Sequence, residues 1–334
     1  MAKSILAFVA AVAMVLVAVT VRAAIDDDDS GGGGGGDASG PLRLVCASEL
    51  RAVCDAVDQN ETGLEVTIEA ATTTVDRLKS VDPDKAEIDG WLAPGPWGEV
   101  VDAVRGSSAE KLFAKSRAPL ARSPLVLAVW KDKRAALSCA DPLSLGCVGD
   151  AVIMRGFRLG MAADEQAEGV IVDAALGAGH IKNADFATND LNESDLSDWI
   201  AAVDTNVDRV TRNPGGRSFT ELLTFGAAAA DGYLSVEAFV GPQFAAAAKR
   251  GQLDLLYAEP AVTADVLFAA ARGDRGNRLR AIVDGDRVRE ALAANGWRVP
   301  GVANIAGVKD APRLRGDDGL PSAGVLQAVR EVTK

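Results

Sequence analysis

The chain has 334 residues, with 35 Lys and Arg against 47 Asp and Glu, so its formal net charge is −12. Nucleic-acid binding needs a basic surface that contacts phosphates, so this acidic balance argues against a nucleic-acid binder. The single histidine, His180, excludes multi-histidine zinc sites and leaves Ser-His or Cys-His catalysis dependent on one residue. Apolar residues make up 48% of the chain, enough for a full core, and the length suits one large or two modest domains.

The N-terminus predicts the compartment. Residues 4–21 form an uncharged apolar run, with Lys3 before it and Arg22 after it. A run of this length is intermediate between a signal-peptide core and a short membrane span. We therefore expect residues 1–24 to be either a signal peptide or an N-terminal membrane anchor, so that the rest is secreted or anchored outside the cytoplasm. Residues 25–40, rich in Asp and Gly, predict a flexible linker.

The four cysteines form two pairs with equal spacing, Cys46 with Cys54 and Cys139 with Cys147. They allow three disulfide connectivities, of which bonding within each pair is the simplest. Each such bond closes a loop of about nine residues, worth roughly 2.5 kcal/mol in the chain-entropy model. Free thiols and a metal site are the alternatives, although zinc ligands usually have gaps of two to four residues. Disulfides agree with an oxidising exterior.

The remaining chain alternates short apolar runs with helical patterns. Its first part reads strand, helix, strand, helix, strand, which predicts a parallel sheet flanked by helices. Ser48 and one of Thr72, Thr73 and Thr74 are expected to cap the first two helices. The expected strands are 42–46, 64–68, 87–92, 124–130, 159–162 and 253–257. The expected helices are 48–57, one starting within 75–81, 168–176, 195–210, 218–225, 233–249, 286–295 and 322–332.

Several segments carry a resemblance through their order and spacing. They are LRLVCASELRAVCDAV, RAPLARSPLVLAVWKDK, FRLGMAADEQAEGVIVDAALGAG, GYLSVEAFV, LDLLYAEPAVTADVLFAAARG and REALAANGWRVPG. Together, over residues 41–334, they resemble the bacterial extracellular solute-binding proteins of the type II periplasmic-binding fold, of the membrane-anchored actinobacterial type. The second segment resembles the strand that crosses between the lobes, and the fifth resembles the return crossing. Tyr257 to Pro260 departs from the family's pattern by two inserted residues.

The resemblance implies an α/β fold of two lobes, each a mostly parallel sheet flanked by helices, joined by two crossing segments. Lobe 1 is then 41–122 plus 262–334, and lobe 2 is 123–261. A small molecule or oxyanion binds between such lobes, and hinge closure buries it. The resemblance further implies a monomer without catalytic activity or cofactor, which delivers its ligand to an ABC-type permease.

The candidate ligand contacts are polar side chains near strand ends, helix starts and the crossings. Main-chain N–H groups at helix starts hold anions without requiring a basic protein. Each candidate also has a structural interpretation, such as a helix cap for Ser48 or core packing for Trp97. The candidates are Ser48, Thr72, Thr73, Trp97, Ser123, Gln166, Glu237 and Glu259.

Two other classes of function remain open at this point. A membrane-anchored sensor or protein-interaction domain would use the same fold without transport. An enzyme on this fold, such as a porphyrin-building deaminase, would need an Arg-rich cleft and a cofactor-bearing cysteine, and a hydrolase would need a positioned base beyond one exposed histidine. The sequence favours neither enzyme, and it leaves oxyanions, sugars and amino acids as almost equal ligand classes.

Overall fold

A computed structural model describes the chain from Gly40 onward with short gaps. Residues 40–334 form one compact unit. The predicted membrane segment, 1–24, and the predicted linker, 25–40, lie outside the described residues except for Gly40. Across the described residues, no helix combines the length and the apolar character that a membrane crossing requires. The described residues are 40–59, 61–183, 186–191, 194–209, 219–259, 261–302, 319 and 321–333.

Lobe 1 is built on parallel strands, as the sequence predicts. The central strand β1 pairs in parallel with β2 on one side and with β3 on the other. A late strand, β9, then joins β3 in the antiparallel direction. The strands are β1 (Leu42–Ala47), β2 (Leu64–Glu69), β3 (Gly90–Pro94) and β9 (Thr263–Ala270). The helices that follow the first three strands are α2 (Arg51–Asp58), α3 (Ala71–Leu78) and α4 (Trp97–Arg105), with short 3-10 turns η1 (Ser48–Leu50) and η2 (Pro83–Lys85).

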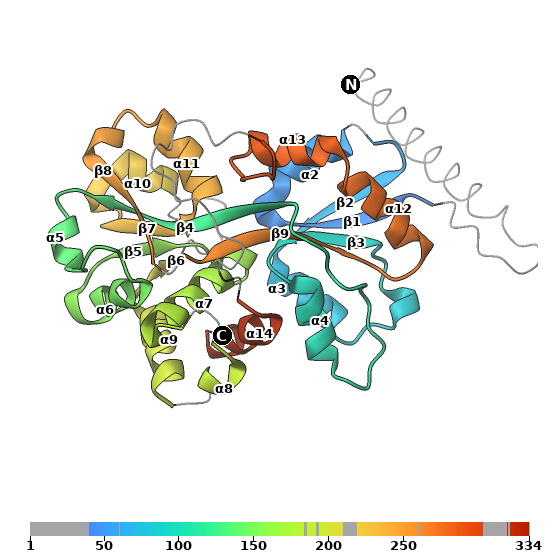
Figure 1. Cartoon of the computed structure of the whole chain (residues 1–334), viewed down its shortest axis with the longest axis horizontal. Helices are drawn as coiled ribbons and strands as arrows, with labels where there is room; N and C mark the ends of the chain where they lie inside the picture. The colour runs from blue at the N-terminus through green and yellow to red at the C-terminus, as the bar shows by residue number, and fades with distance from the viewer. Residues whose placement is uncertain are drawn as a thin grey trace, which may run out of the picture. The chain divides into compact units, whose positions relative to one another are not determined.

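One long strand, β4 (Ala121–Trp130), belongs to both lobes. Its first residues, 121–124, pair with β9 of lobe 1, whereas 125–130 pair with β7 and β8 of lobe 2. Figure 1 shows β4 and β9 running side by side through the middle of the unit, with helices on either side. Strand β4 and the connection from β8 to β9 are therefore the two crossing segments.

Lobe 2 is built on the second part of β4, residues 125–130. Its sheet contains β7 against β4, then β5 and β6 in parallel. The strands are β5 (Leu159–Met161), β6 (Asp208–Arg209), β7 (Gly232–Val236) and β8 (Leu253–Tyr257). The helices are α5 (Arg134–Leu137), α6 (Leu145–Arg155), α7 (Ala167–Ile181), α8 (Thr188–Leu191), α9 (Ser194–Asn206), α10 (Phe219–Phe225) and α11 (Glu237–Ala246), with 3-10 turns η3 (Gly226–Ala228) and η4 (Arg250–Gln252).

Helix α7 is the buried helix of lobe 2. Every residue from 167 to 178 is buried, which suits a helix with few polar residues and no solvated face. It crosses α6 at two glycines, where a Cβ on Gly146 would lie 2.6 Å from the carbonyl oxygen of Gly179. This close approach explains why both helices carry glycine at the crossing.

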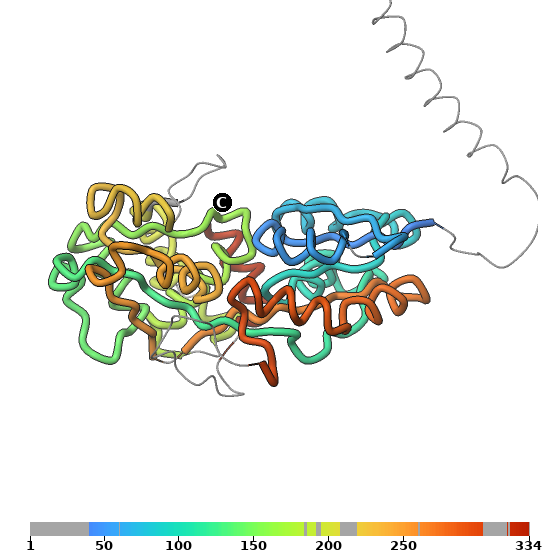
Figure 2. Tube along the Cα trace, turned by 90° about the horizontal axis from the view of Figure 1, so that it is seen from above, coloured from blue at the N-terminus to red at the C-terminus, as the bar shows by residue number. Residues whose placement is uncertain are grey.

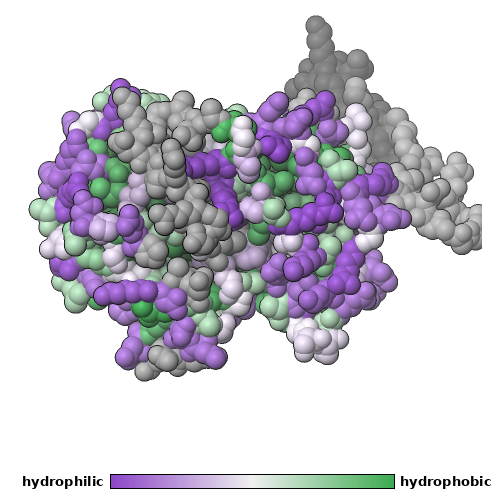
Figure 3. Space-filling model, in the orientation of Figure 1, coloured by the Kyte–Doolittle hydropathy of each residue, from purple (hydrophilic) through white to green (hydrophobic). Residues whose placement is uncertain are grey.

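Three further helices follow β9: α12 (Asp274–Val283), α13 (Asp286–Ala294) and α14 (Ala323–Val332). Helix α14 packs against α4 and also against α7, α8 and α9. In Figures 1 and 2 it is the red helix between the two lobes. The predicted division assigns this helix to lobe 1, but in the structure it contacts both lobes. On the face that Figure 3 shows, hydrophilic residues predominate over both lobes.

The two predicted disulfides are confirmed. Cys46 bonds with Cys54, and Cys139 bonds with Cys147. The first bond is fully buried and ties β1 to α2, whereas the second lies near the surface and joins the segment after α5 to α6.

The structure corrects several local predictions. The helix predicted over 195–210 ends at Asn206, and residues 208–209 form β6. The helix predicted to start within 75–81 begins at Ala71.

Residues 233–249 do not form one helix, because Gly232–Val236 is the strand β7 and the helix α11 begins at Glu237. The apolar run YLSVEAFV is too short for its periodicity to separate a buried strand from a buried helix. The predicted helix caps are also wrong. Ala47 precedes η1 and Ala70 precedes α3, and neither helix start has a side-chain cap.

Candidate functional site

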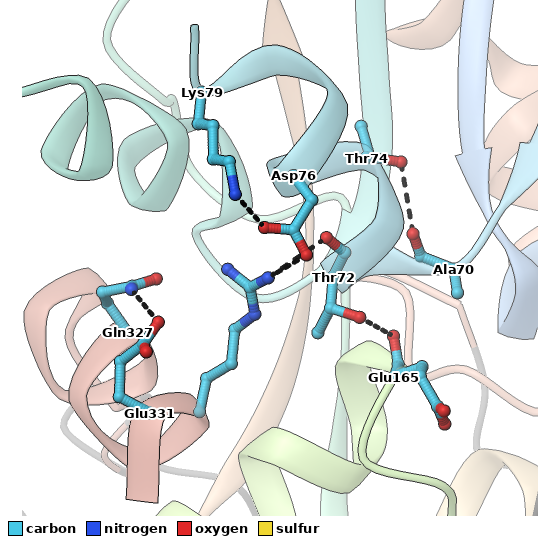
Figure 4. A network of polar contacts seen from close by, with 9 residues as sticks. Ala70, Thr72, Thr74, Asp76, Lys79, Glu165, Gln327 and Glu331 are labelled. Atoms are coloured by element: carbon cyan, nitrogen blue, oxygen red, sulfur yellow. Dashed lines mark hydrogen bonds and ion pairs between the residues drawn. The ribbon is translucent and has the colours of Figure 1, made fainter. Parts of the chain in front are cut away.

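The two lobes meet along a set of polar contacts that we name the interlobe seam. It consists of Ser48, Glu49 and Thr72 from lobe 1 and residues 165–168 with Ser235 from lobe 2. The Thr72 side chain donates a hydrogen bond from Oγ1 to the Glu165 carbonyl oxygen at 3.1 Å, as Figure 4 shows. The Thr72 N–H donates to the same oxygen at 3.2 Å. Two predicted ligand residues, Ser48 and Thr72, thus lie where the lobes touch.

The start of α7 forms the lobe 2 side of the seam. The first N–H groups of a helix have no partner within the helix and carry partial positive charge. Here the Glu168 N–H donates to Glu49 Oε1 of lobe 1 at 3.0 Å. Gln166, another predicted ligand residue, occupies the position before the helix and makes no side-chain cap. A carboxylate of the opposite lobe therefore occupies an anion-binding helix start.

The same glutamate receives a second bond within its own lobe. Ser48 Oγ donates to Glu49 Oε2 at 3.0 Å, which fixes the carboxylate toward lobe 2. Burial raises the pKa of the Glu49 carboxyl, although the hydrogen bonds from Glu168 and Ser48 oppose that rise. Ser48 consequently positions Glu49 instead of capping a helix.

Glu168 lies on the other side of this contact and is only 4% exposed. Its Oε1 accepts hydrogen bonds from the Ser235 hydroxyl and, at 3.2 Å, from the Val236 N–H. Burial raises its pKa to about 7, and the negative charge of Glu49 contributes to the increase. The sequence analysis missed Glu49, Glu168 and Ser235 as site residues. The available signal was acidic residues in the first turns after β1 and β5, each beside a predicted candidate.

A second cluster lies at the hinge. Glu237, at the start of α11, is fully buried and pairs with Arg298 from the segment after α13. Arg298 Nε donates to Oε1 at 2.8 Å and Nη2 donates to Oε2 at 2.7 Å, while the Tyr257 hydroxyl donates to Oε2 at 2.6 Å. Both oxygens of this predicted ligand residue are therefore held by the protein itself.

The crossing strands support the hinge cluster. Ser123 of β4 is fully buried, and its Oγ accepts a hydrogen bond from the Ala238 N–H at 2.9 Å. The neighbouring Arg122 pairs with Asp265 of β9 at 3.2 Å. Ser123, a predicted ligand residue, thus bonds the start of α11 and connects the crossing strand β4 to lobe 2.

The other predicted site residues are Trp97, Thr73 and Glu259, and none of them is part of the polar contacts described above. Trp97 is 1% exposed, packs against Trp91, and donates from Nε1 to the Pro94 carbonyl oxygen at 2.7 Å. Thr73 and Glu259 are exposed. Trp97 therefore packs in the core, as its structural interpretation predicted.

Helix α14 supports the seam from the side. Arg330 is only 3% exposed, and its Nη2 lies 2.5 Å from Asp76 Oδ2 of α3. The same nitrogen is 3.5 Å from the Thr72 carbonyl oxygen, at the limit of a hydrogen bond. Figure 4 shows Asp76 and Thr72 on the same side of α3, with Lys79 also directed toward Asp76. The buried guanidinium thus ties α14 to the helix that carries Thr72.

Neither a metal-binding cluster nor the large surface cavity described next is part of the seam, as far as the described residues show. Among these residues no three His, Cys, Asp or Glu side chains gather closely enough to hold a metal ion. A cavity of about 760 Å³ opens beside α4 on the surface of lobe 1, with Asp102 and Phe113 in its lining. The seam groups are instead paired directly with one another.

Comparison with known proteins identifies the fold. No protein-family model matches the chain, and no curated protein sequence matches it either. A periplasmic thiamin binding protein is similar in structure, with a TM-score of 0.56, 13% identity and coverage of 91% of this chain and 98% of that chain. Iron-bound HitA from Pseudomonas aeruginosa gives a TM-score of 0.57 and 16% identity, over 87% and 99% of the two chains.

A third similar structure is the periplasmic binding protein AfuA from Actinobacillus pleuropneumoniae, with exogenous fructose-6-phosphate bound. Its TM-score is 0.58 at 11% identity, over 89% of this chain and 97% of that chain. The protein therefore has the two-lobe, type II periplasmic-binding fold. At these identities the likeness shows the fold alone, so function has to be argued from this chain's own residues.

Proposed function

We propose that this protein is an extracytoplasmic receptor that binds a small solute between its lobes and delivers it to an ABC-type importer. The observation that carries the proposal is the interlobe seam. There the hydroxyl of Thr72 and the Ser48–Glu49 turn of lobe 1 face the α7 start of lobe 2. A cleft of this kind presents hydroxyls and helix N–H groups from both sides to one ligand.

The proposed binding step is an exchange of partners. When the lobes separate at the hinge, the Thr72 hydroxyl and the α7 N–H groups lose the partners they have in the seam. A solute with acceptor oxygens then takes the place of the Glu165 carbonyl and of the Glu49 carboxylate, and hinge closure buries it. No covalent chemistry is required, so we propose a binding protein without catalytic residues or cofactor.

The cellular setting belongs to the same proposal. The apolar N-terminal run supports export, with residues 1–24 either cleaved or retained as an anchor. The two disulfides support an oxidising compartment. We propose a monomer held at or released from the outer surface of the membrane, as in the actinobacterial anchored type that the sequence resembles.

Thermal unfolding of the full chain, with both disulfides formed, tests the proposal. The panel contains oxyanions, amino acids, sugars and polyamines. A bound solute at a hundredfold excess over its Kd adds about 2.7 kcal/mol to the free energy of unfolding, so the Tm rises by several degrees. Ser48→Ala and Thr72→Val should reduce that rise, whereas Thr205→Val, at an exposed threonine of α9, should not. The absence of a shift with every class would contradict a small-solute receptor.

A sensor or protein-interaction domain is the second candidate. One observation favours it: polar groups of the two lobes bond one another directly in the seam, Thr72 with Glu165 and Glu49 with the Glu168 N–H. The thermal unfolding experiment distinguishes the two candidate functions. A protein-interaction domain would be stabilised by a partner protein and by no member of the solute panel.

A further inference from the structure

The two carboxyl groups of the seam are held by neutral donors. Glu49 accepts from Ser48 Oγ and from the Glu168 N–H, and Glu168 accepts from the Ser235 hydroxyl and the Val236 N–H. Two acidic side chains, the buried Glu168 and the half-buried Glu49, thus lie in one contact between the lobes. Such an arrangement favours the protonated form of one carboxyl group.

The charged groups on the neighbouring elements have partners of their own. Arg330 of α14 pairs with Asp76 of α3, and Arg298 pairs with Glu237 at the hinge. Tyr233 of β7 also faces Glu168, but burial and the glutamate's charge raise its pKa, so the phenol stays neutral. Proton uptake is therefore expected at the two glutamates, and near neutral pH at Glu168.

Lobe opening changes the surroundings of both glutamates. In the closed form, burial raises the pKa of each, that of Glu168 to about 7. When the lobes separate, water reaches the α7 start and Glu49 moves away from Glu168, so both pKa values fall toward the ordinary value of an exposed carboxyl. The closed form consequently binds protons more tightly than the open form.

We propose that the contact between Glu49 and Glu168 is a proton-linked latch, in which proton uptake favours the closed lobes and proton release favours the open ones. The direction of this pH effect follows from thermodynamic linkage, because acid favours the form that binds the proton more tightly. The latch needs no solute. It can therefore be tested on the ligand-free chain, and its failure is distinguishable from failure of the proposed receptor function.

The test measures the distance between the lobes as a function of pH. Fluorescent labels on keto amino acids introduced at Glu65 of β2 and Met154 of α6, both exposed, leave the two disulfides intact. Energy transfer is recorded on the full chain from pH 5.5 to 8.5. We expect the closed-to-open ratio to fall as the pH rises toward 7, by up to about tenfold per pH unit, the limit for one proton, and to level off above about pH 7.

Variants assign the effect to the seam. Glu168→Gln keeps an acceptor for Ser235 but cannot ionise, so its closed-to-open ratio should stay nearly constant across the range. Glu49→Gln should weaken the pH response, because it removes the neighbouring charge. Glu290→Gln, at an exposed position of α13, should retain the wild-type response. A pH-independent distance in the wild type overturns the proposal even if a variant does not fold, and so does an unchanged response in Glu168→Gln.

Discussion

Glu237 illustrates how one residue connects several elements. Its buried carboxylate binds Arg298, which follows α13, and Tyr257, which ends β8. The residue itself begins α11, beside the Ser123 contact with the crossing strand. A buried ion pair with all its hydrogen bonds satisfied contributes little net free energy, but removal of one partner leaves an uncompensated charge. The hinge should therefore be sensitive to single substitutions.

Arg298→Met tests that sensitivity. The variant leaves Glu237 buried without its cation, and we expect it to lower the free energy of unfolding by about 3–5 kcal/mol. Arg287→Met is the matched control, because Arg287 is 63% exposed in its pair with Glu61, and exposed pairs contribute about 0–1 kcal/mol. Urea unfolding followed by circular dichroism measures both. Equal losses in the two variants would show that Glu237 is not the buried partner described here.

Glu168 makes a separate prediction about the pH dependence of stability. Its pKa is raised in the folded protein, to about 7, so the folded state holds a proton that the unfolded state releases above about pH 4.5. Stability from this group is thus complete at low pH and is lost as the pH rises toward 7. Relative to Glu168→Gln, the wild type should lose on the order of 2 kcal/mol between pH 5 and 8. Urea titrations at both pH values measure this, and a difference independent of pH would contradict it.

At the scale of elements, the crossing of α6 and α7 depends on two glycines. A Cβ on Gly146 would lie 2.6 Å from the Gly179 carbonyl oxygen, so Gly146→Ala must push two buried helices apart. We expect a loss of about 1–3 kcal/mol, typical of an overpacked core. Gly251→Ala is the control, because nothing lies within 4 Å of its added Cβ, and its effect should stay within about 0.5 kcal/mol. Urea unfolding of both variants decides between the two expectations.

The two disulfides allow a comparison at equal loop length. Both join cysteines eight positions apart, so loop closure predicts a similar loss, roughly 2.5 kcal/mol, when either is removed. Cys46 and Cys54 are fully buried, whereas Cys139 and Cys147 are partly exposed. Replacement of both members by Ser should therefore cost more at Cys46–Cys54, since two hydroxyls become buried. A larger loss at Cys139–Cys147 in urea unfolding would show that burial does not govern the difference.

Secondary structure follows from the sequence where apolar runs are bounded by clear turns. The first three strands and their parallel pairing are confirmed, as are the helices near 286–295 and 322–332. Strand β7 was missed because YLSV leads into an equally apolar helix, and no turn residue marks the junction at Glu237. The helix caps failed for a different reason. Ser48 bonds the side chain of its neighbour Glu49, and Thr72 bonds Glu165 of the other lobe, so both hydroxyls have partners other than a helix start.

The site was only partly predictable for the same reason. Hydroxyl residues after strands indicated Ser48 and Thr72, which do lie in the interlobe seam. Glu49 and Glu168 escaped prediction because acidic residues in a first helical turn are common and usually solvated. Their importance depends on which helix start faces which turn across two lobes, and that pairing is a property of the whole fold.

At the scale of the whole molecule, three sets of contacts connect the lobes. The crossing strands and the Glu237 cluster form the hinge. At the seam, the start of α7 in lobe 2 bonds residues of lobe 1. Helix α14 packs against helices of both lobes. A receptor that opens must release the seam and the packing of α14 while the hinge strands persist. Among the described residues, the polar groups that must separate on opening therefore lie at the start of α7 and around Thr72.

Amide hydrogen exchange of the full chain, measured with and without each solute of the panel, tests the receptor account most directly. The account predicts that one class of solute slows exchange together in residues 47–50, 70–73, 165–169 and 235–236, which come from both lobes and line the seam. Slowed exchange confined to the outer face of one lobe, or unchanged exchange at the seam with every solute, would contradict it.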